Sequence, residues 1–464
     1  MAADFFRRTF EGKRIAILGF GLEGRSTYRY IRGLMPDIRL HICDRNENIG
    51  QSDKYKTAES NDSWFLGHDY LKGLQSADII VKSPGISLKE LRGVSTARIT
   101  SQTEIFLKAF RDQVVGITGT KGKSTTASLL YHLLIAVGKP AFLAGNIGTP
   151  CFELIDMIEE DSIIVFELSS HQLENVEVSP HIAILLNIFK EHLDHYDSYD
   201  AYKEAKMNIA LWQQDGDMFI YNSENKEVRT LVCGLNTAAK HLPLRLSPGE
   251  GDGAWYDGSD LILSDQGREY RFPDVANRRL LPGVHNLLNI SAAVRAANLL
   301  DVPADRITDA VASFRGLAHR MEYIGTFGGV TYCNDSIATI PEAAIEAVKA
   351  LPDTSVLILG GKDRGLDYAA LMSFLADSQV EFILFTGETA GKMHDIAGNY
   401  PGLASKRCFV ADTFEDAVAQ ACRMAPAGST VLLSPAAASY DAFTDFKARG
   451  ERFKELVKKY ALNG

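Results

Sequence analysis

The chain has 464 residues, a length that predicts two to four domains, each large enough for its own core. Its apolar fraction of 46% and charged fraction of 23% are ordinary for a globular protein, and its formal net charge of −10 argues against a general nucleic-acid binder. The six cysteines are scattered without a Cys-x-x-Cys pair, so we expect buried thiols of a reducing compartment and neither a zinc site nor a disulfide framework. No apolar run approaches the ~20 residues of a membrane helix and no signal peptide is evident, so we expect a cytoplasmic protein without a membrane partner.

The first region alternates predicted strands and helices, which is typical of a doubly wound parallel sheet. A strand over 14–18 is followed by Gly19–Gly24, which reads GFGLEG and matches G-x-G-x-x-G, and then by a helix from Arg25. Asp44 follows about twenty residues later, as a dinucleotide-binding fingerprint requires. Taken alone, this pattern indicates NAD or FAD, although the same turn can hold other nucleotide diphosphates. Further strands are predicted over 38–43 and 77–82.

The segment Val114–Thr126 reads VVGITGTKGKSTT, an apolar strand followed by a glycine-rich turn and a helix-forming stretch. Gly119 and Gly122 would let backbone amides approach phosphates. Lys123 would reach the terminal phosphates, and the hydroxyl of Ser124 can ligate Mg²⁺. The spacing is shorter than the strict Walker form, and the alternative is an ordinary strand–turn–helix with a solvated lysine. Strand, glycines, lysine and serine nevertheless stand in the order that a phosphate loop requires.

Three further residues of the central region are candidates for chemistry beside bound phosphates. Glu167 closes a predicted strand over 162–166, where a carboxylate can face the phosphate loop and bind Mg²⁺; it could equally open a helix. His192, in the polar sequence EHLDHY, could ligate metal or donate to a phosphoryl oxygen, but a histidine in a polar loop is usually a solvated surface group. Lys206 lies in a predicted helix, where most lysines are solvated.

The remaining elements continue the α/β alternation. Residues 213–280 are rich in Asp, Gly and short apolar alternations, which predicts a small antiparallel excursion and not a new domain. A helix is predicted over 284–300 and another from Pro341, because proline suits the first helical turn. The other predicted strands cover 182–187, 356–361, 382–387 and 431–435, and the other predicted helices cover 102–110, 414–424 and the Lys- and Arg-rich C-terminal segment.

Polar residues of the third region stand where an α/β domain binds ligands. Arg320, Asp335 and Arg364 each follow or end an apolar segment, and loops at the carboxyl ends of parallel strands form binding sites. Ser439 and Phe446 lie beyond the predicted strand 431–435. A phenylalanine at such a position is more often part of a core than a ligand contact.

Taken together, these residues resemble the Mur ligase superfamily along nearly the whole chain. The resemblance depends on motifs that stand in the family's order: GTKGKST, NIG at 146–148, ELSS, NIFKEHLDHY, HN-x-x-N at 285–289, HRME at 319–322, NDS-x-A-T at 334–339, the LGG turn and LLSPAAASYDAF. It implies an α/β fold of three domains: a Rossmann-like UDP-substrate domain (1–101), a central P-loop ATPase-type domain (102–317) and a C-terminal Rossmann-like domain (318–464). The first nucleotide motif would then hold a uridine diphosphate and the second would hold ATP.

The resemblance also implies an activity. Such a chain would be an ATP-dependent, Mg²⁺-requiring amide ligase that adds D-glutamate to UDP-N-acetylmuramoyl-L-alanine through an acyl phosphate, in the synthesis of peptidoglycan precursors. Its partners would be these small molecules, without nucleic acid or membrane, and we expect a monomer. The third domain would close over the site and exclude the water that hydrolyses acyl phosphates.

Roles are implied residue by residue. Catalysis is assigned to Lys123, Glu167, His192, Lys206 and Arg320, and the metal to Ser124, Glu167, His192 and Lys206, the last as a carbamate formed with CO₂. ATP would be bound by Gly119, Thr120, Gly122, Lys123, Ser124, Thr125, Asn286, Asn289, Arg320 and Asp335. The UDP substrate would be bound by Gly21, Leu22, Glu23, Asp44, Arg45, Ser83, Gly85 and Asn146. D-Glutamate would be bound by Thr339, Arg364, Ser439 and Phe446.

Three positions depart from the family pattern. Ile337 stands where some relatives have lysine, and Ile cannot pair with a phosphate; Arg364 replaces a lysine and could bind a carboxylate bidentately; Lys121 replaces the usual asparagine. Other readings are a different amide ligase of the superfamily or a folylpolyglutamate synthase, although no D-N-P-R motif is present and the latter lacks the GFGLEG domain. An NAD-dependent dehydrogenase and a non-catalytic nucleotide-binding regulator are the alternatives from other classes.

Overall fold

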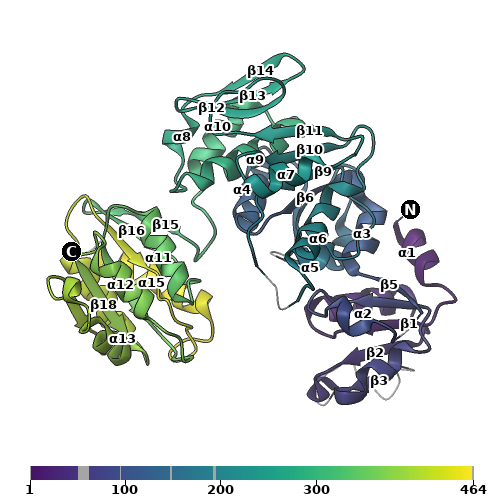
Figure 1. Ribbon diagram of the computed structural model, residues 1–464, viewed down its shortest axis with the longest axis horizontal. Helices are drawn as coiled ribbons and strands as arrows, with labels where there is room; N and C mark the ends of the chain where they lie inside the picture. The colour runs from purple at the N-terminus through teal and green to yellow at the C-terminus, as the bar shows by residue number, and fades with distance from the viewer. Residues whose placement is uncertain (1, 51–61, 95, 147–148, 192–194, 462–464) are drawn as a thin grey trace. The chain divides into compact units, whose positions relative to one another are not determined.

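The computed structural model describes residues 2–50, 62–94, 96–146, 149–191 and 195–461, which form two compact units (Figure 1). The first unit comprises Met1–Asn277 and Leu287–Val311, and the second comprises Arg278–Asn286 and Ala312–Gly464. Two sheets lie in the first unit and one in the second, and helices accompany all three. The predicted α/β class is therefore confirmed, whereas the domain boundaries at 101 and 317 stay a prediction.

The first sheet is parallel, as the alternating sequence pattern predicted, and its strand order is β3-β2-β1-β4-β5. Helix α2 begins at Leu22 and not at Arg25, because Gly19, with a φ of 87°, turns the chain directly into the helix. The strands are β1 (Ile15–Leu18), β2 (Leu40–Asp44), β3 (Ser63–Leu66), β4 (Ile79–Lys82) and β5 (Arg98–Thr100). The helices are α1 (Ala2–Phe10) and α2 (Leu22–Leu34), with short 3₁₀ turns at Glu47–Gly50, Gly67–Leu74 and Leu88–Leu91.

The second sheet has nine strands in the order β14-β13-β12-β11-β10-β9-β6-β8-β7. The antiparallel excursion predicted over 213–280 is confirmed for β12 to β14, but β10 and β11 extend the parallel part of the sheet. The strand sequence MFIYN of β10 is nearly all apolar, as parallel strands covered on both faces usually are. The strands are β6 (Val114–Thr118), β7 (Ala141–Gly145), β8 (Ile163–Glu167), β9 (Ile182–Leu185), β10 (Met218–Asn222), β11 (Lys240–Leu244), β12 (Gly253–Asp257), β13 (Asp260–Asp265) and β14 (Arg268–Phe272).

Helices connect and cover this second sheet. The predicted helix over 102–110 is confirmed at the same residues, and the one over 284–300 is confirmed to within one residue at each end. The helices are α3 (Gln102–Phe110), α4 (Lys123–Ala136), α5 (Ser170–Leu173), α6 (Tyr199–Leu211), α7 (Lys226–Cys233), α8 (Val275–Arg278), α9 (His285–Leu299) and α10 (Ala304–Ser313), with 3₁₀ turns at Arg111–Gln113 and Cys151–Met157.

The sheet of the second unit has the order β15-β16-β20-β17-β18-β19, in which only β15 is antiparallel to its neighbour. Separate apolar cores cover its two faces. The strands are β15 (Glu322–Phe327), β16 (Val330–Asn334), β17 (Thr354–Gly360), β18 (Phe382–Thr386), β19 (Arg407–Val410) and β20 (Thr430–Leu433). The helices are α11 (Pro341–Ala350), α12 (Ala369–Ala376), α13 (Ala390–Ala397), α14 (Phe414–Met424) and α15 (Phe446–Ala461), with a 3₁₀ turn at Pro401–Leu403.

The cysteines only partly follow the expectation of buried thiols. Cys43, Cys151 and Cys333 are buried, Cys408 and Cys422 are partly exposed, and Cys233 is exposed because it ends α7 at the surface. All six are free thiols, in agreement with the absence of a disulfide pattern in the sequence. In the described part of the chain, none of the helices has the length and apolar character needed to cross a membrane.

Candidate active site

The phosphate loop connects the carboxyl end of β6 to the first turn of α4. Gly122 has a φ of 87°, and a Cβ atom there would lie 2.5 Å from the side-chain oxygen of Asn289 on α9. Glycine is therefore required both by the backbone conformation and by the close approach of Asn289. The backbone N–H of Thr120 donates to the carbonyl of Asn187 at 2.9 Å, which fixes the loop to the end of β9. The resulting turn has the geometry of a phosphate cradle at a helix N-terminus.

Lys123 is the first residue of α4 and folds back over the loop. Its ammonium donates to the backbone oxygens of Gly119 at 2.8 Å and Thr120 at 3.1 Å. Ser124 and Thr125 follow in the first helical turn and are partly exposed. Residues at this position add hydroxyl groups to a helix end that already favours negative charge. The predicted phosphate ligands are thus brought together.

Glu167 is the last residue of β8 and is fully buried. One carboxylate oxygen accepts a hydrogen bond of 2.8 Å from the side-chain amide of Asn146, and the other has no hydrogen-bond partner among the described residues. Because burying a carboxylate oxygen without a partner is costly, this atom fits a divalent cation. The next helix is capped by Ser169, in a capping box with Gln172, so Glu167 ends a strand and does not open a helix.

Lys206 of α6 is not a solvated helix lysine, because it is only 2% exposed. Its ammonium donates to the carbonyl of Gly119 at 2.9 Å and lies 5.0 Å from the ring centre of Tyr202. Burial, and then the nearby charge of Lys123, lower the pKa of Lys206 well below the ordinary lysine value. The ammonium groups of Lys123 and Lys206 therefore donate to the same carbonyl of the phosphate loop, that of Gly119.

The predicted metal ligand His192 lies outside the described residues. Within the described ranges, no three His, Cys, Asp or Glu side chains lie close enough to hold a metal ion by themselves. Mg²⁺ usually keeps several waters and binds through one or two carboxylates plus substrate phosphates. Ser124 and Glu167 are the described residues of the predicted metal set that carry oxygen ligands.

A second candidate binding turn lies at the carboxyl ends of β1, β2 and β4 in the first sheet. A Cβ atom on Gly19 would lie 2.8 Å from Cβ of Ser83, whose hydroxyl donates to the Gly19 carbonyl at 2.8 Å. The carboxylate of Asp44 accepts a 2.6 Å hydrogen bond from the backbone N–H of Phe20. The predicted residues Gly21, Leu22 and Gly85 are exposed at this edge, with Leu22 71% exposed.

Two predicted UDP-binding side chains make protein contacts there. The carboxylate of Glu23 accepts a 2.8 Å hydrogen bond from Gln172 of α5, so it points toward the second sheet. Arg45 donates to the hydroxyl of Tyr70 at 3.1 Å and pairs with Glu90. The structure thus brings the residues of the predicted turn together, but the charged groups of Glu23 and Arg45 contact neighbouring protein residues.

In the second unit, the loops that follow β16, β20 and β17 carry most of the predicted residues, and these three strands are neighbours. Asp335 follows β16 and is 5% exposed; it accepts hydrogen bonds from the Ser434 hydroxyl at 2.8 Å and the Met321 N–H at 3.2 Å. Burial raises the pKa of Asp335 to about 7, although those hydrogen bonds and the charge of Arg320 oppose the shift. Arg320 itself is exposed. Asn286, on α9, donates to the carbonyl of Pro282 at 2.6 Å.

The predicted amino-acid ligands differ in their exposure. Ser439 is buried, Thr339 is partly buried and Arg364 is exposed. Phe446 begins α15 and is half-buried, with its ring 6.1 Å from that of His319. These side chains follow three adjacent strands, at the edge where parallel sheets bind ligands.

A residue that the sequence pattern did not single out ties these loops together. Arg449 of α15 is 2% exposed, and its guanidinium donates to the carbonyls of Ser336, Gly360, Ala437 and Ala438 and to the hydroxyl of Ser336, at 2.9–3.4 Å. No carboxylate hydrogen-bonds to it among the described residues, and burial lowers its pKa to about 10. One arginine in a Lys- and Arg-rich helix carries no pattern that would have revealed this role.

Raising the pH should destabilise the second unit through Asp335. Its pKa is about 7 in the folded chain against an ordinary 3.8, so ionisation between pH 4 and 7 favours the unfolded chain. Each unit of such a shift corresponds to about 1.4 kcal/mol, and the stabilisation is complete below pH 4 and lost as pH rises through 7. Urea denaturation from pH 4 to 8 should show this slope in the natural chain and a smaller slope in Asp335→Asn. Equal slopes in the two proteins would contradict the prediction.

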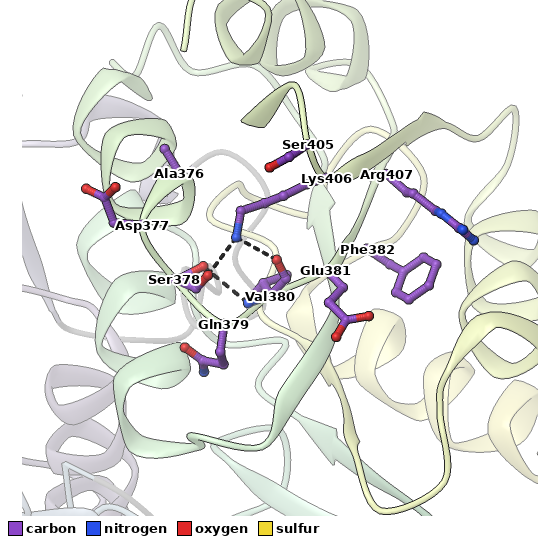
Figure 2. A pocket seen from close by; sticks show the side chains of 10 residues that line it. All are labelled: Ala376, Asp377, Ser378, Gln379, Val380, Glu381, Phe382, Ser405, Lys406 and Arg407. Atoms are coloured by element: carbon purple, nitrogen blue, oxygen red, sulfur yellow. Dashed lines mark hydrogen bonds between the residues drawn. The ribbon is translucent and has the colours of Figure 1, made fainter. Parts of the chain in front are cut away.

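A hollow of about 540 Å³ in the second unit lies at the opposite end of its sheet (Figure 2). Phe382 and Arg407, which begin β18 and β19, line it. The ammonium of Lys406 donates to the carbonyls of Ser378 at 2.6 Å and Val380 at 2.8 Å, and these residues line the hollow in Figure 2. Because ligands of open α/β sheets bind at the carboxyl ends of strands, this hollow is not the predicted amino-acid site.

Comparison with known proteins agrees with this geometry. The profile of the Mur ligase middle domain matches residues 117–297, and that of the Mur ligase, glutamate ligase domain matches residues 319–437. Among solved structures, the chain is similar to UDP-N-acetylmuramate–alanine ligase from Thermotoga maritima, with a TM-score of 0.54, 16% identity and coverage of 96% of this chain and 99% of that one. It is also similar to a UDP-N-acetylmuramoyl-L-alanyl-D-glutamate–2,6-diaminopimelate ligase, with a TM-score of 0.57, 16% identity and coverage of 85% and 86%. The solved structures agree in fold, and the two domain matches identify the class of protein as a Mur ligase.

Curated relatives narrow this class. A UDP-N-acetylmuramoylalanine–D-glutamate ligase from Symbiobacterium thermophilum is 34% identical over 455 residues, which cover 96% of this chain and 98% of the relative. The enzyme of the same name from Ruminiclostridium cellulolyticum is 31% identical over 461 residues, covering 97% and 98%. The chain belongs to the family of UDP-N-acetylmuramoylalanine–D-glutamate ligases.

Proposed function

We propose that the chain is the ATP-dependent, ADP-forming ligase that joins D-glutamate to UDP-N-acetylmuramoyl-L-alanine in peptidoglycan precursor synthesis. The observation that carries the proposal is the pairing of a phosphate cradle with a buried, partly unsatisfied carboxylate, Glu167, in a chain that matches such ligases over nearly its full length. The net charge of −10 does not conflict, because the cations that bind the substrates are local.

In this reaction the carboxylate of the UDP-sugar-alanine attacks the γ-phosphate of ATP, which gives an acyl phosphate and ADP. The amine of D-glutamate then attacks the acyl carbon, and inorganic phosphate leaves with the amide formed and the amine proton released. The protein's contribution is to position and to offset charge, which is where catalysis of phosphoryl transfer mostly arises. Lys123 supplies positive charge at the phosphate loop, and Arg320 is proposed to supply more.

Binding roles follow the same proposal. Gly119, Thr120, Gly122, Thr125, Asn286, Asn289 and Asp335 are proposed for ATP, and Gly21, Leu22, Asp44, Ser83, Gly85 and Asn146 for the UDP substrate. Glu23 and Arg45 remain in the UDP set through their place beside that turn, since their charged groups already have protein partners. Thr339, Arg364, Ser439 and Phe446 are proposed for D-glutamate. The domain boundaries at 101 and 317, a monomeric state and a cytoplasmic location belong to the proposal as well.

The metal site is proposed to consist of Ser124, Glu167, His192 and a carbamate on Lys206. Mg²⁺ bound there would neutralise charge that develops on the transferred phosphoryl group. The unpartnered oxygen of Glu167 fits such an ion. A carbamate requires a neutral amine to react with CO₂, and burial gives Lys206 that tendency. Carbamylation would replace a buried cation by an anion beside the metal.

Replacement of Lys206 by alanine should abolish most turnover, by about 10²-fold or more, because an anionic group next to the phosphate loop is lost. Short-chain carboxylic acids added to the Lys206→Ala variant should restore part of the activity by supplying that anion. Phosphate release with and without acetate is the measurement. Lys203→Ala, on the same helix but paired with Asp200 at the surface, is the matched control. Full turnover of the Lys206 variant without added acid would remove the carbamate from the proposal.

The substrate assignment is tested by phosphate release with ATP, Mg²⁺, UDP-N-acetylmuramoyl-L-alanine and a panel of amino acids. We expect turnover with D-glutamate and at most background with L-glutamate, lysine or diaminopimelate. Turnover with one of the latter alone would assign the chain to another amide ligase of the class. Tight binding of NADH in a fluorescence titration would favour the dehydrogenase reading, and ATP binding without ADP release in any mixture would favour a regulator.

A further inference from the structure

A largely buried cluster of ionisable side chains joins the two sheets of the first unit. Lys82, the last residue of β4, is 3% exposed. Its ammonium donates to the carbonyl of Ile86 at 2.7 Å and to the carboxylate of Glu174 at 3.2 Å. The same carboxylate oxygen lies 3.4 Å from Nε2 of His195. Removing one partner of such a buried group leaves the others uncompensated, so the members of the cluster depend on one another.

At one end, the cluster holds the turn that is proposed to bind the UDP substrate. Lys82 immediately precedes Ser83, and its ammonium binds Ile86, which closes the turn. The turn is also held from the other side, because the backbone N–H of Ser83 donates to Leu18 and its hydroxyl donates to Gly19. Lys82 therefore links a turn of the first sheet to a residue outside that sheet.

At the other end, Glu174 terminates the segment that carries the proposed metal ligand Glu167. Between them, the capping box of Ser169 and Gln172 fixes α5, and Gln172 donates to Glu23 of the first sheet's α2. A second segment reaches the same carboxylate through His195, which belongs to the sequence EHLDHY that contains His192. The backbone oxygen of His195 accepts a 3.0 Å hydrogen bond from Ser87, just beyond the turn.

Lys82 is the only ionisable residue of β4. β4 is otherwise apolar, and its Ile79, Ile80 and Val81 pack in the cores on the two faces of the first sheet. Burial lowers the pKa of Lys82 below the ordinary lysine value, and the negative charges of Glu174, Glu23 and Glu90 oppose that shift. The positive charge is thus stabilised by groups from both sides of the junction between the sheets.

We propose that Lys82 is a positioning residue for ligation. Through Glu174 it holds the UDP-binding turn in register with the two segments that carry Glu167 and His195. This inference rests on the proposed function and adds a residue that touches neither substrate nor metal. The two nucleotides would still bind without it, but the substrate carboxylate would be misplaced relative to the γ-phosphate, and small misplacements are costly for phosphoryl transfer.

The test uses the full chain and the variants Lys82→Met, Glu174→Gln and their combination. We expect each single variant to lower kcat at least tenfold while the dissociation constant of uridine 5′-diphosphate, measured by calorimetry, changes less than threefold, because the hydrogen bonds of Ser83 remain. The kcat of the double variant should be no more than threefold below that of Lys82→Met, because the two substitutions remove the same interaction. The control is Lys72→Met, which replaces an exposed lysine in the 3₁₀ turn Gly67–Leu74 of the same unit; its kcat should stay within threefold of that of the natural chain.

Three outcomes would overturn the inference: a kcat within threefold of the natural chain, multiplicative losses in the double variant, or loss of uridine diphosphate binding together with kcat. Glu174→Gln keeps the shape of the side chain and carries the test if Lys82→Met fails to fold. Hydrogen–deuterium exchange separates this inference from the substrate assignment. In Lys82→Met, exchange should rise both at Gly85–Ile86 and around His195, whichever amino acid the enzyme ligates, and a rise at only one of them would contradict the coupling.

Discussion

Replacing Lys123 with alanine is expected to lower kcat by about 10²–10³-fold, the effect of removing one preorganised charge from a phosphoryl-transfer site. The ammonium of Lys123 is held over the phosphate loop by the carbonyls of Gly119 and Thr120, so it is in place before ATP binds. Such preorganisation stabilises charge in the transition state without reorganisation during the reaction.

Steady-state phosphate release is the measurement for this variant. Lys139→Ala is the matched control, because Lys139 lies just beyond the far end of α4, and its kcat should stay within about threefold. Circular dichroism should show that both variants fold alike. Turnover of Lys123→Ala at the natural rate would mean that the loop does not hold the transferred phosphates, and the proposed function would lose its main support.

Replacing Arg449 with methionine is expected to lower the free energy of unfolding of the second unit by about 3–5 kcal/mol, because a buried, fully bonded charged group is lost. Four carbonyl groups and one hydroxyl, from the loops after β16 and β20 and from the end of β17, would each lose one hydrogen bond at once. The loops after these three strands carry Thr339, Arg364 and Ser439, so the KM for D-glutamate should rise at least tenfold in whatever fraction stays folded.

Urea denaturation of the full chain and the dependence of rate on D-glutamate concentration measure the two effects. Arg452→Met is the matched control: this arginine lies one turn later on α15, is 43% exposed and pairs with Glu415 and Glu455. Exposed ion pairs are worth about 0–1 kcal/mol, so its variant should change little. Arg449→Lys, which keeps the charge but has fewer donors, should fall between the two. An Arg449→Met protein as stable as the control would refute this role.

The elements that the sequence predicted well are those whose signals are local. The predicted helices at 102–110 and 414–424 occur at the same residues, and the strand, loop and helix around Gly122 follow the predicted order. Strand β3 was missed because its four residues are all only partly buried and show no clear alternation. The start of α2 was placed three residues late, since the glycine turn before it needs fewer residues than the pattern suggested.

For the candidate site too, the sequence located features with local signals and missed contacts between distant segments. The family motifs located the phosphate loop, Glu167 and the three loops of the second unit, because each motif is a short sequence with a defined backbone geometry. They could not show that Lys206 would be buried, that Glu23 would face Gln172, or that Lys82 would meet Glu174, 92 residues further on. These contacts depend on how distant segments pack.

By itself, the sequence determined the family, the α/β class with many of its elements, and the position of the glycine-rich loop, since glycine spacing and apolar periodicity act over a few residues and need no distant partner. Only the tertiary structure decided which charged groups are buried and what they bind. The free-energy cost of burying a charged lysine or arginine depends on the local dielectric and on the hydrogen-bond acceptors around it, and remote parts of the chain supply both. Lys82 and Arg449 stand in the sequence like many other cations, and packing alone makes them the links between loops.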